Sequence, residues 1–128
     1  MKRRLKKFVS LILIGCIATA MFSITAFAGQ TNLTTSYNGF GASGYVKAAT
    51  TSASALLRYE KSDKLKILLS TKWSDDGGIH YYYTNNSANT TGTSVSAYWS
   101  RAAGQTATSS TAYYYINGYN FATKTASV

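Results

Sequence analysis

The sequence predicts an all-β protein, in particular a small antiparallel β-sandwich of six to eight strands, with a small barrel as the alternative. After residue 28, apolar and polar residues alternate with a period of two, and we find no helical period of useful length. Turn-forming residues separate the alternating segments at short intervals. All 11 tyrosines also lie in residues 29–128, and Tyr and Thr favour the half-buried surface of a sheet.

The first 28 residues have the organisation of a bacterial export signal. Residues 1–7 carry five Lys or Arg, and an almost unbroken apolar stretch follows from residue 8 to residue 25. Ala26-Phe27-Ala28 then provides the small-x-small pattern that signal peptidase cleaves, just before Gly29. We expect cleavage after Ala28, so that residues 29–128 form one secreted domain without a stable membrane anchor.

Two alternatives concern the same segment. Residues 8–28 are long enough to span a bilayer as an uncleaved anchor. Leu13-Ile14-Gly15-Cys16 also resembles a lipoprotein cleavage box, with Cys16 as the lipidated residue. Cleavage there leaves an apolar run next to the lipid, where a polar tether is expected. Cleavage before Gly29 is therefore the favoured interpretation.

The composition of residues 29–128 excludes several classes of protein. Removing the signal removes the one cysteine and five of the 13 basic residues, which leaves eight basic and four acidic side chains and a net charge of +4. Without cysteine, a disulfide scaffold, a zinc–cysteine cluster and thiol catalysis are excluded. Val, Ile, Leu and Phe are few, but the modest charge and the many aromatic rings distinguish the chain from a disordered tail.

Alternation predicts which side chains of each strand face the interior. The expected inward sets are Ala53, Ala55, Leu57 and Tyr59; Leu65, Ile67, Leu69 and Trp73; Ile79, Tyr81 and Tyr83; Val95, Ala97 and Trp99; and Ala112, Tyr114 and Ile116. Residues 33–37 and 45–49 are weaker strand candidates.

Turns and loops are expected between these strands. Asn117-Gly118 is the strongest hairpin signal, between residues 111–116 and 119–123. Residues 74–78, rich in Asp and Gly, join a second hairpin over residues 64–84. Further turns or loops are expected in residues 38–44, 60–63, 85–92 and 101–110.

The secreted chain offers little for catalysis. The residues that could act as a catalytic acid or base are His80, Glu60, Asp63, Asp75 and Asp76. The four carboxylates all fall in predicted turns. A Ser-His-Asp site needs a histidine that is oriented by an acid and lies beside a hydroxyl, whereas His80 is expected in a strand as an exposed or half-packed side chain. The Asp and Gly residues after residue 74 lack the spacing of a calcium loop. We expect no enzyme, no metal and no cofactor.

Half of the basic residues after residue 28 are lysines within twelve positions, from Lys61 to Lys72. Lys64, Lys66 and Lys72 should point to the same side of one strand. Such a stripe suits anionic wall polymers, lipid phosphates or nucleic acid. Export and the small net charge disfavour nucleic acid. The alternative is that these lysines only protect an edge strand from aggregation.

Two runs of three tyrosines, residues 81–83 and 113–115, cannot bury every ring, because side chains alternate along a strand. Tyr82, Tyr113 and Tyr115 are expected to be exposed. Exposed tyrosines suit sugar rings and protein surfaces. The alternative is that cross-strand tyrosine pairs only stabilise the sheet.

Residues 95–115, VSAYWSRAAGQTATSSTAYYY, resemble the C-terminal half of Sec-exported bacteriocins of the lactococcin type. In that family a strand with Ala and Trp, a polar loop and a closing strand with an aromatic pair complete a small β-sandwich. The matching positions are Ala97, Trp99, Ala112, Tyr113 and Tyr114. The resemblance covers about a fifth of the secreted chain. It implies a secreted antimicrobial protein that binds cell-wall precursor.

These observations predict a secreted, non-catalytic binding protein for cell-envelope components, with a bacteriocin-like antimicrobial as its sharpest form. The expected partner is an anionic cell-wall polymer, a wall precursor or an envelope glycan. Its expected contacts are Lys64, Lys66 and Lys72 for phosphate or carboxylate, and Tyr82, Tyr113 and Tyr115 for stacking. The alternative is a structural matrix or fibre subunit that self-associates through its β-edges, because proline-free chains rich in Ser, Thr, Asn and Gly with Tyr ladders stack in this way.

Overall fold

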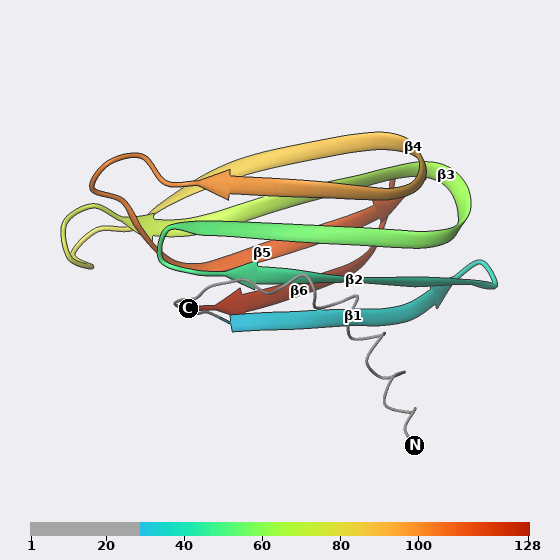
Figure 1. Ribbon diagram of the computed structural model, residues 1–128, viewed down its shortest axis with the longest axis horizontal. Coiled ribbons are helices and arrows are strands. Elements are labelled where there is room, and N and C mark those ends of the chain that lie inside the picture. The colour runs from blue at the N-terminus through green and yellow to red at the C-terminus, as the bar shows by residue number, and fades with distance from the viewer. Residues whose placement is uncertain (1–28) are drawn as a thin grey trace, which may run out of the picture.

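The computed structural model describes residues 29–128, and the expected export signal lies outside the described residues. Six strands and their connections make up this part of the chain (Figure 1): β1 Gly29–Tyr37, β2 Phe40–Ala48, β3 Ser52–Ser74, β4 Tyr82–Ser100, β5 Thr106–Ile116 and β6 Tyr119–Ser127. Residues 29–128 contain no helix with the length and hydropathy needed to cross a membrane. The all-β prediction is confirmed.

All six strands join one antiparallel sheet in the order β1-β2-β3-β5-β6, with β4 paired to β3. The first half of β3 pairs with β2 and its second half with β5, while β4 lies beside β3 along both halves. The register between β3 and β4 shifts between Arg58 and Asp63, and Figure 1 shows both strands turning back on themselves near this point. The sheet therefore curls over its own inner face.

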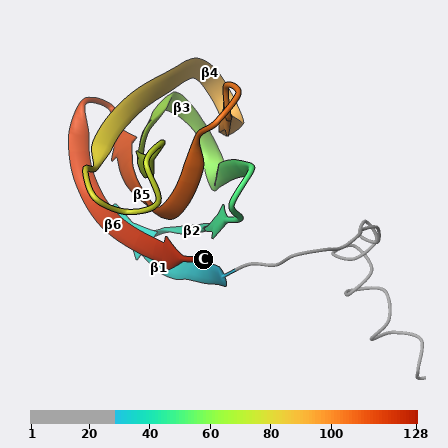
Figure 2. The same cartoon turned by 90° about the vertical axis from the view of Figure 1, so that its left-hand side faces the viewer.

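The two ends of this sheet meet where β1 lies beside β6 (Figure 2). The Thr31 hydroxyl donates a hydrogen bond to the Thr125 carbonyl oxygen over 2.7 Å. A Cβ atom on Gly29 would overlap the carbonyl oxygen of Ser127, so the close approach requires glycine. The antiparallel sheet is thus nearly closed like a barrel. Its division into two packed layers, as in a sandwich, stays a prediction.

The inward side chains form one core. Four of the five expected inward sets are buried as predicted, apart from Trp73, which packs against the core but stays partly exposed. Strands β1, β2 and β6 add Leu33, Ala42, Val46, Ala48 and Ala126. The core also holds a polar pair, because the hydroxyls of Thr71 and Ser110 lie 2.7 Å apart and both residues are fully buried. One hydroxyl donates to the other, which offsets part of the cost of burying them.

The prediction that Ile79, Tyr81 and Tyr83 form an inward face was wrong. Residues 75–81 form a loop, and Ile79 is 73% exposed. Asp76 Oδ1 accepts hydrogen bonds from the backbone N–H groups of Ile79 and His80, and Ser74 Oγ accepts one from that of Gly78. Because these local bonds occupy the backbone groups that a strand needs, β4 starts only at Tyr82. The hairpin over residues 64–84 is confirmed.

The expected loop over residues 85–92 was also wrong, because this polar segment pairs with β3 throughout. Residues 60–63 remain inside β3 at its bend, and the expected loop over residues 101–110 ends where β5 begins at Thr106. In residues 38–44 the turn is limited to Asn38-Gly39, with φ values of 51° and 81°. Asn117-Gly118 forms the predicted hairpin turn, with φ values of 52° and 83°.

Candidate functional site

The outer surface of β3 carries the three lysines expected to bind anions. Lys64, Lys66 and Lys72 alternate with Leu65, Ile67 and other fully buried residues, so all three point away from the core. Cross-strand pairing sets their neighbours. Lys64 lies opposite Thr91 of β4, Lys66 lies between Asn89 of β4 and Tyr115 of β5, and Lys72 lies between Tyr83 of β4 and Ser109 of β5.

Lys66 is held over an aromatic ring. Its ammonium nitrogen lies 5.1 Å from the centroid of the Tyr115 ring, within the range of a cation–π contact. Tyr113 lies on the same face of β5, opposite Leu68. Both tyrosines are half-buried on the outer surface, so part of each side chain is accessible.

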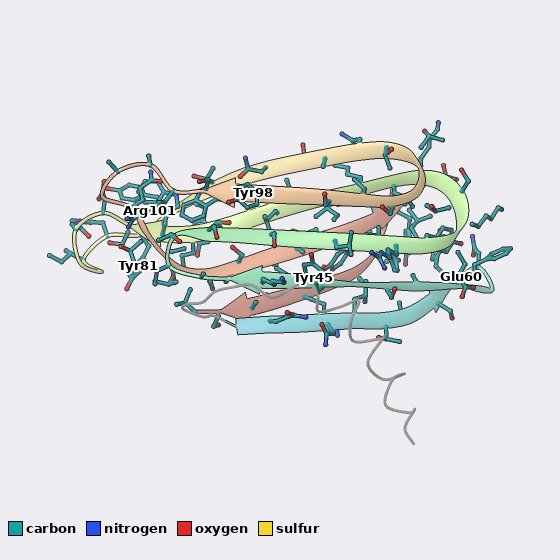
Figure 3. All side chains as sticks on the ribbon, in the orientation of Figure 1. Tyr45, Glu60, Tyr81, Tyr98 and Arg101 are labelled. Carbon is teal, nitrogen blue, oxygen red and sulfur yellow. The ribbon has the colours of Figure 1, made fainter. Side chains whose placement is uncertain are left out.

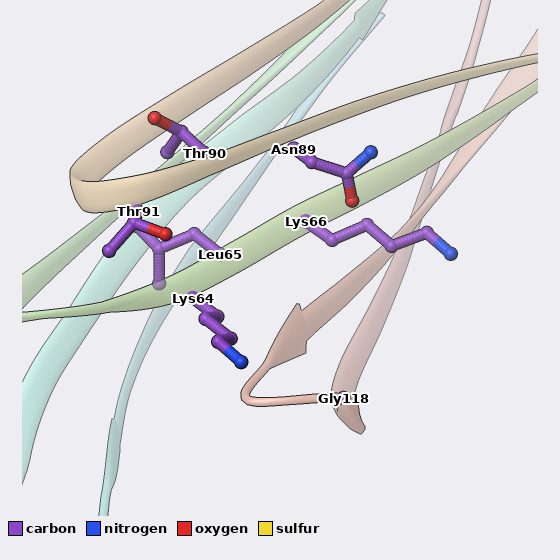
Figure 4. A pocket seen from close by; sticks show the side chains of 7 residues that line it. All are labelled: Lys64, Leu65, Lys66, Asn89, Thr90, Thr91 and Gly118. Atoms are coloured by element: carbon purple, nitrogen blue, oxygen red, sulfur yellow. The ribbon is translucent and has the colours of Figure 1, made fainter.

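A recess of about 390 Å³ opens beside Lys66 (Figure 4). Its lining consists of Lys64, Leu65, Lys66, Asn89, Thr90, Thr91 and Gly118. The Asn117 N–H donates to the Lys64 carbonyl oxygen over 2.7 Å, which fixes the β5–β6 turn against β3. None of the seven lining residues is acidic. The recess is therefore lined by two lysine side chains, an amide and hydroxyls, and the β5–β6 turn borders it.

Lys72 and Tyr82 lie away from this recess. Lys72 is eight positions from Lys64, roughly 27 Å along an extended strand. Its ammonium nitrogen lies 4.6 Å from the centroid of the Tyr81 ring. Tyr82 is 46% exposed, but it faces the opposite side of β4, where its ring centroid lies 4.9 Å from that of Trp73. The structure therefore brings together three of the six predicted contact residues, Lys64, Lys66 and Tyr115, while Tyr113 lies on the same outer face, opposite Leu68.

Sequence reasoning missed the β4 contribution to the recess. Asn89 and Thr91 belong to the segment that we expected to be a loop, and every residue around them except Ala88 is polar or glycine. A period of two cannot be recognised when both faces of a strand are polar. The repeated Thr residues, which favour strands, were the available signal.

A second exposed surface lies at the end of the molecule with the 75–81 loop. Figure 3 shows Tyr81, Tyr98 and Arg101 gathered at this end. Ile79 and Tyr83 are more exposed than any other large apolar residue among residues 29–128, at 73% and 66%. This surface differs from the recess because an exposed apolar side chain, that of Ile79, lies in a loop closed by local hydrogen bonds.

The polar groups of this loop are not arranged for nucleophilic catalysis. His80 Nδ1 lies 2.6 Å from Asp76 Oδ2, and the Ser74 hydroxyl donates to Asp76 Oδ1 over 2.8 Å. The carboxylate lies between the other two groups, whereas a serine nucleophile needs the histidine in that place. The backbone N–H and the ring of His80, followed by the Ser74 hydroxyl, hold the pKa of the Asp76 carboxyl well below its usual range. This arrangement closes the loop.

No group of three or more His, Cys, Asp or Glu side chains that could hold a metal ion occurs within residues 29–128. No family model matches the chain, and no curated protein and no solved structure matches it either. The resemblance to lactococcin-type bacteriocins therefore stays a prediction.

Proposed function

We propose that this is a secreted, non-catalytic protein that binds an anionic polymer, a wall precursor or a glycan of the cell envelope. The observation that carries the proposal is the recess between β3, β4 and the β5–β6 turn. It combines two lysines with an amide and hydroxyls, and the Tyr115 ring adjoins it across Lys66.

The chemistry of the recess suits a phosphate- or carboxylate-bearing sugar unit. The ammonium groups of Lys64 and Lys66 supply positive charge, and no lining carboxylate competes with the ligand for them. Asn89 and Thr91 can donate to phosphate oxygens or exchange hydrogen bonds with sugar hydroxyls. The accessible parts of Tyr113 and Tyr115 offer flat apolar faces with polar tips, which suit a sugar ring.

The size and exposure of the recess also fit a polymer better than a small buried ligand. A volume of about 390 Å³ is at the lower end for ligand sites, which is room for one repeat unit. Because Lys64 is exposed, its interaction with an anion is screened by salt over a Debye length of about 8 Å at physiological ionic strength. Affinity for a polymer then comes from repeated contacts, and it should fall as salt is raised.

The test is co-sedimentation of the purified protein with isolated Gram-positive walls at low and at high salt. The double variant Lys64→Gln, Lys66→Gln should lose about tenfold in apparent affinity at low salt, since two charged contacts of roughly 0.7 kcal/mol each are removed. Lys47→Gln is the matched control, because Lys47 also lies over a tyrosine ring, that of Tyr45 at 4.9 Å, outside the recess. The control removes one charge and the double variant removes two, so a loss of about threefold in Lys47→Gln would show that only net charge matters. Unchanged binding by the double variant would refute the proposal.

The sharpest form of the proposal is a bacteriocin-like antimicrobial with the sandwich architecture of the lactococcin type. The resemblance over residues 95–115 supports it, and four of the five matching residues, Ala97, Trp99, Ala112 and Tyr114, are buried in the core. Growth of Gram-positive indicator cells should be inhibited by the wild-type protein and less by the Lys64→Gln, Lys66→Gln variant. If the protein binds walls but does not inhibit growth, the binding proposal stands and the antimicrobial proposal is refuted.

A further inference from the structure

Strand β4 leaves one edge of the sheet without a partner strand. Within residues 29–128, β4 pairs with β3 alone, whereas β1 and β6, at the two ends of the strand order, lie against each other. β4 is 19 residues long and contains no Lys, Arg, Asp, Glu or Pro. Charged residues, proline and short length are the usual means by which a free edge avoids pairing, and β4 has none of these.

The first half of β4 is also poorly covered. No residue from Tyr82 to Ser94 is buried, although the facing residues Leu65, Ile67 and Leu69 of β3 are at most 1% exposed. On the core-facing side of this half, the Asn86 Oδ1 atom is buried and has no hydrogen-bond partner. An unpaired acceptor of this kind costs free energy unless a donor is brought to it. The backbone N–H groups of an added strand lie in the plane of the sheet, so a side chain on the core-facing side of that strand would bring such a donor.

We propose that the first half of β4, residues 82–92, pairs edge to edge and antiparallel with the same segment of a second copy of this chain. A two-fold axis places a segment opposite itself, so any charge in it would face its own kind. An uncharged edge avoids this repulsion, and that property favours self-pairing over a charged partner strand. Backbone hydrogen bonds and ladders of Asn and Thr side chains then hold the two copies together.

The nearby lysines do not oppose this pairing. Lys64, Lys66 and Lys72 lie on β3, one strand in from the edge. Across the paired edges, the lysines of the two copies are three strand spacings apart, about 14 Å. This exceeds the Debye length of about 8 Å at physiological ionic strength, so their repulsion is largely screened. The recess lies on the outer face of the sheet, which edge pairing leaves open, so the dimer does not depend on the proposed function.

Pairing through β4 closes at two copies. Within residues 29–128, each copy uses its free β4 edge for the pairing. The other two outer strands of the sheet, β1 and β6, already contact each other. A fibre built by strand addition needs a second free edge. The inference is therefore a dimer, which differs from the matrix or fibre alternative predicted from composition.

Sedimentation of the purified protein over a wide range of concentration tests this pairing. One variant carries Asn85→Lys and Ser87→Lys, and another carries Asn85→Glu and Ser87→Glu, all on the outer face of β4 and outside the recess lining. We expect a dimer for the wild type and a monomer for each variant alone. An equimolar mixture of the two variants should restore the dimer, because opposite charges then face each other in any register.

The control carries Ser36→Lys and Ser43→Lys, exposed positions on β1 and β2. It should remain a dimer, and circular dichroism should show the same fold for all variants. A monomeric wild type overturns the proposal and leaves the β4 edge for a strand of another protein. Charged variants that stay dimeric place the interface elsewhere. Assemblies larger than a dimer contradict the closed pairing and favour a fibre.

Discussion

The Lys66 ammonium lies over the Tyr115 ring because the register of β3 and β5 places these two residues directly opposite each other. The same kind of contact recurs in Lys47 over Tyr45 and Lys72 over Tyr81. An exposed cation–π contact contributes only about 0.5–1 kcal/mol, so it orders a lysine without preventing the ammonium from turning to an anion. Aromatic rings thus hold several of the cations in position on this surface.

The contribution of Tyr115 to binding is the first prediction. Tyr115→Leu should weaken wall binding by about three- to tenfold, because it removes both the support under Lys66 and the stacking face. Tyr115→Phe keeps the ring and should stay within about twofold of the wild type. The measurement is the co-sedimentation described above. Equal binding by the Leu variant would exclude Tyr115 from the site.

The buried hydroxyl pair of Thr71 and Ser110 gives a second prediction. Thr71→Val and Ser110→Ala should each reduce the free energy of unfolding by about 1–3 kcal/mol, since each leaves the other hydroxyl buried without a partner. The double variant should lose less than the sum of the two. Urea unfolding measures this coupling.

The control for this cycle is the exposed pair of Thr111 and Thr125, whose hydroxyls lie 2.8 Å apart. Valine at both positions should change the free energy of unfolding by less than about 0.5 kcal/mol, because water replaces the lost bonds. Strict additivity in the buried cycle would mean that Thr71 and Ser110 do not interact in solution.

A third prediction concerns Tyr114, which is fully buried and whose hydroxyl has no hydrogen-bond partner. Burial raises the pKa of this hydroxyl well above its usual range, so the group stays neutral but desolvated. Tyr114→Phe removes the desolvated group and keeps the ring, and it should stabilise the protein by about 1 kcal/mol.

Tyr59→Phe is the matched comparison, because the Tyr59 hydroxyl donates to the Tyr37 carbonyl oxygen over 2.7 Å. This variant should instead lose about 1 kcal/mol in the free energy of unfolding. The opposite signs of the two changes are the expected result in thermal or urea unfolding. Destabilisation by Tyr114→Phe would show that the Tyr114 hydroxyl is bonded in solution.

The fourth prediction is a pH dependence that arises from Asp76. Its hydrogen bonds lower the pKa of the folded carboxyl below its ordinary value of 3.8. The stabilisation is therefore fully present above about pH 4, and it is lost as the pH falls below 4 through the lower pKa of the folded state. The protection of the Ile79 and His80 amides against exchange, relative to the intrinsic rate at each pH, should fall over this window.

In Asp76→Asn the carboxylate is absent, so exchange at these amides should show little change below pH 4 beyond the intrinsic effect of pH. Asp75→Asn alters the exposed neighbouring carboxylate and should behave as the wild type. Identical profiles for the wild type and Asp76→Asn would mean that Asp76 does not close the loop.

Much of the core could be predicted from alternation alone. Where apolar and polar residues alternate, as in residues 65–69 and 95–99, the buried face follows from the period of two. The turn at Asn117-Gly118 followed from the need for positive φ at both residues. These are local properties, and local chemistry determines them.

The site required information that is not local. The pairing of Lys66 with Tyr115 depends on the register of two strands distant in the sequence, and Asn89 reaches the recess only because a wholly polar segment pairs with β3. The loop at residues 75–81 depends on one carboxylate that takes up backbone N–H groups. A wholly polar strand and a loop closed by side-chain hydrogen bonds leave no periodic pattern in the sequence. The predictions for residues 79–83 and 85–92 were therefore wrong.

The binding site itself is tested most directly by nuclear magnetic resonance of the labelled protein. The probe is a soluble phosphate-bearing polymer released from Gram-positive walls, added at low salt. We predict that backbone signals shift at Lys64, Lys66, Asn89, Thr91 and Tyr115 and that those of Tyr45 and Lys47 stay in place. Shifts confined to other surfaces, or no shifts at concentrations at which the protein co-sediments with walls, would contradict the account.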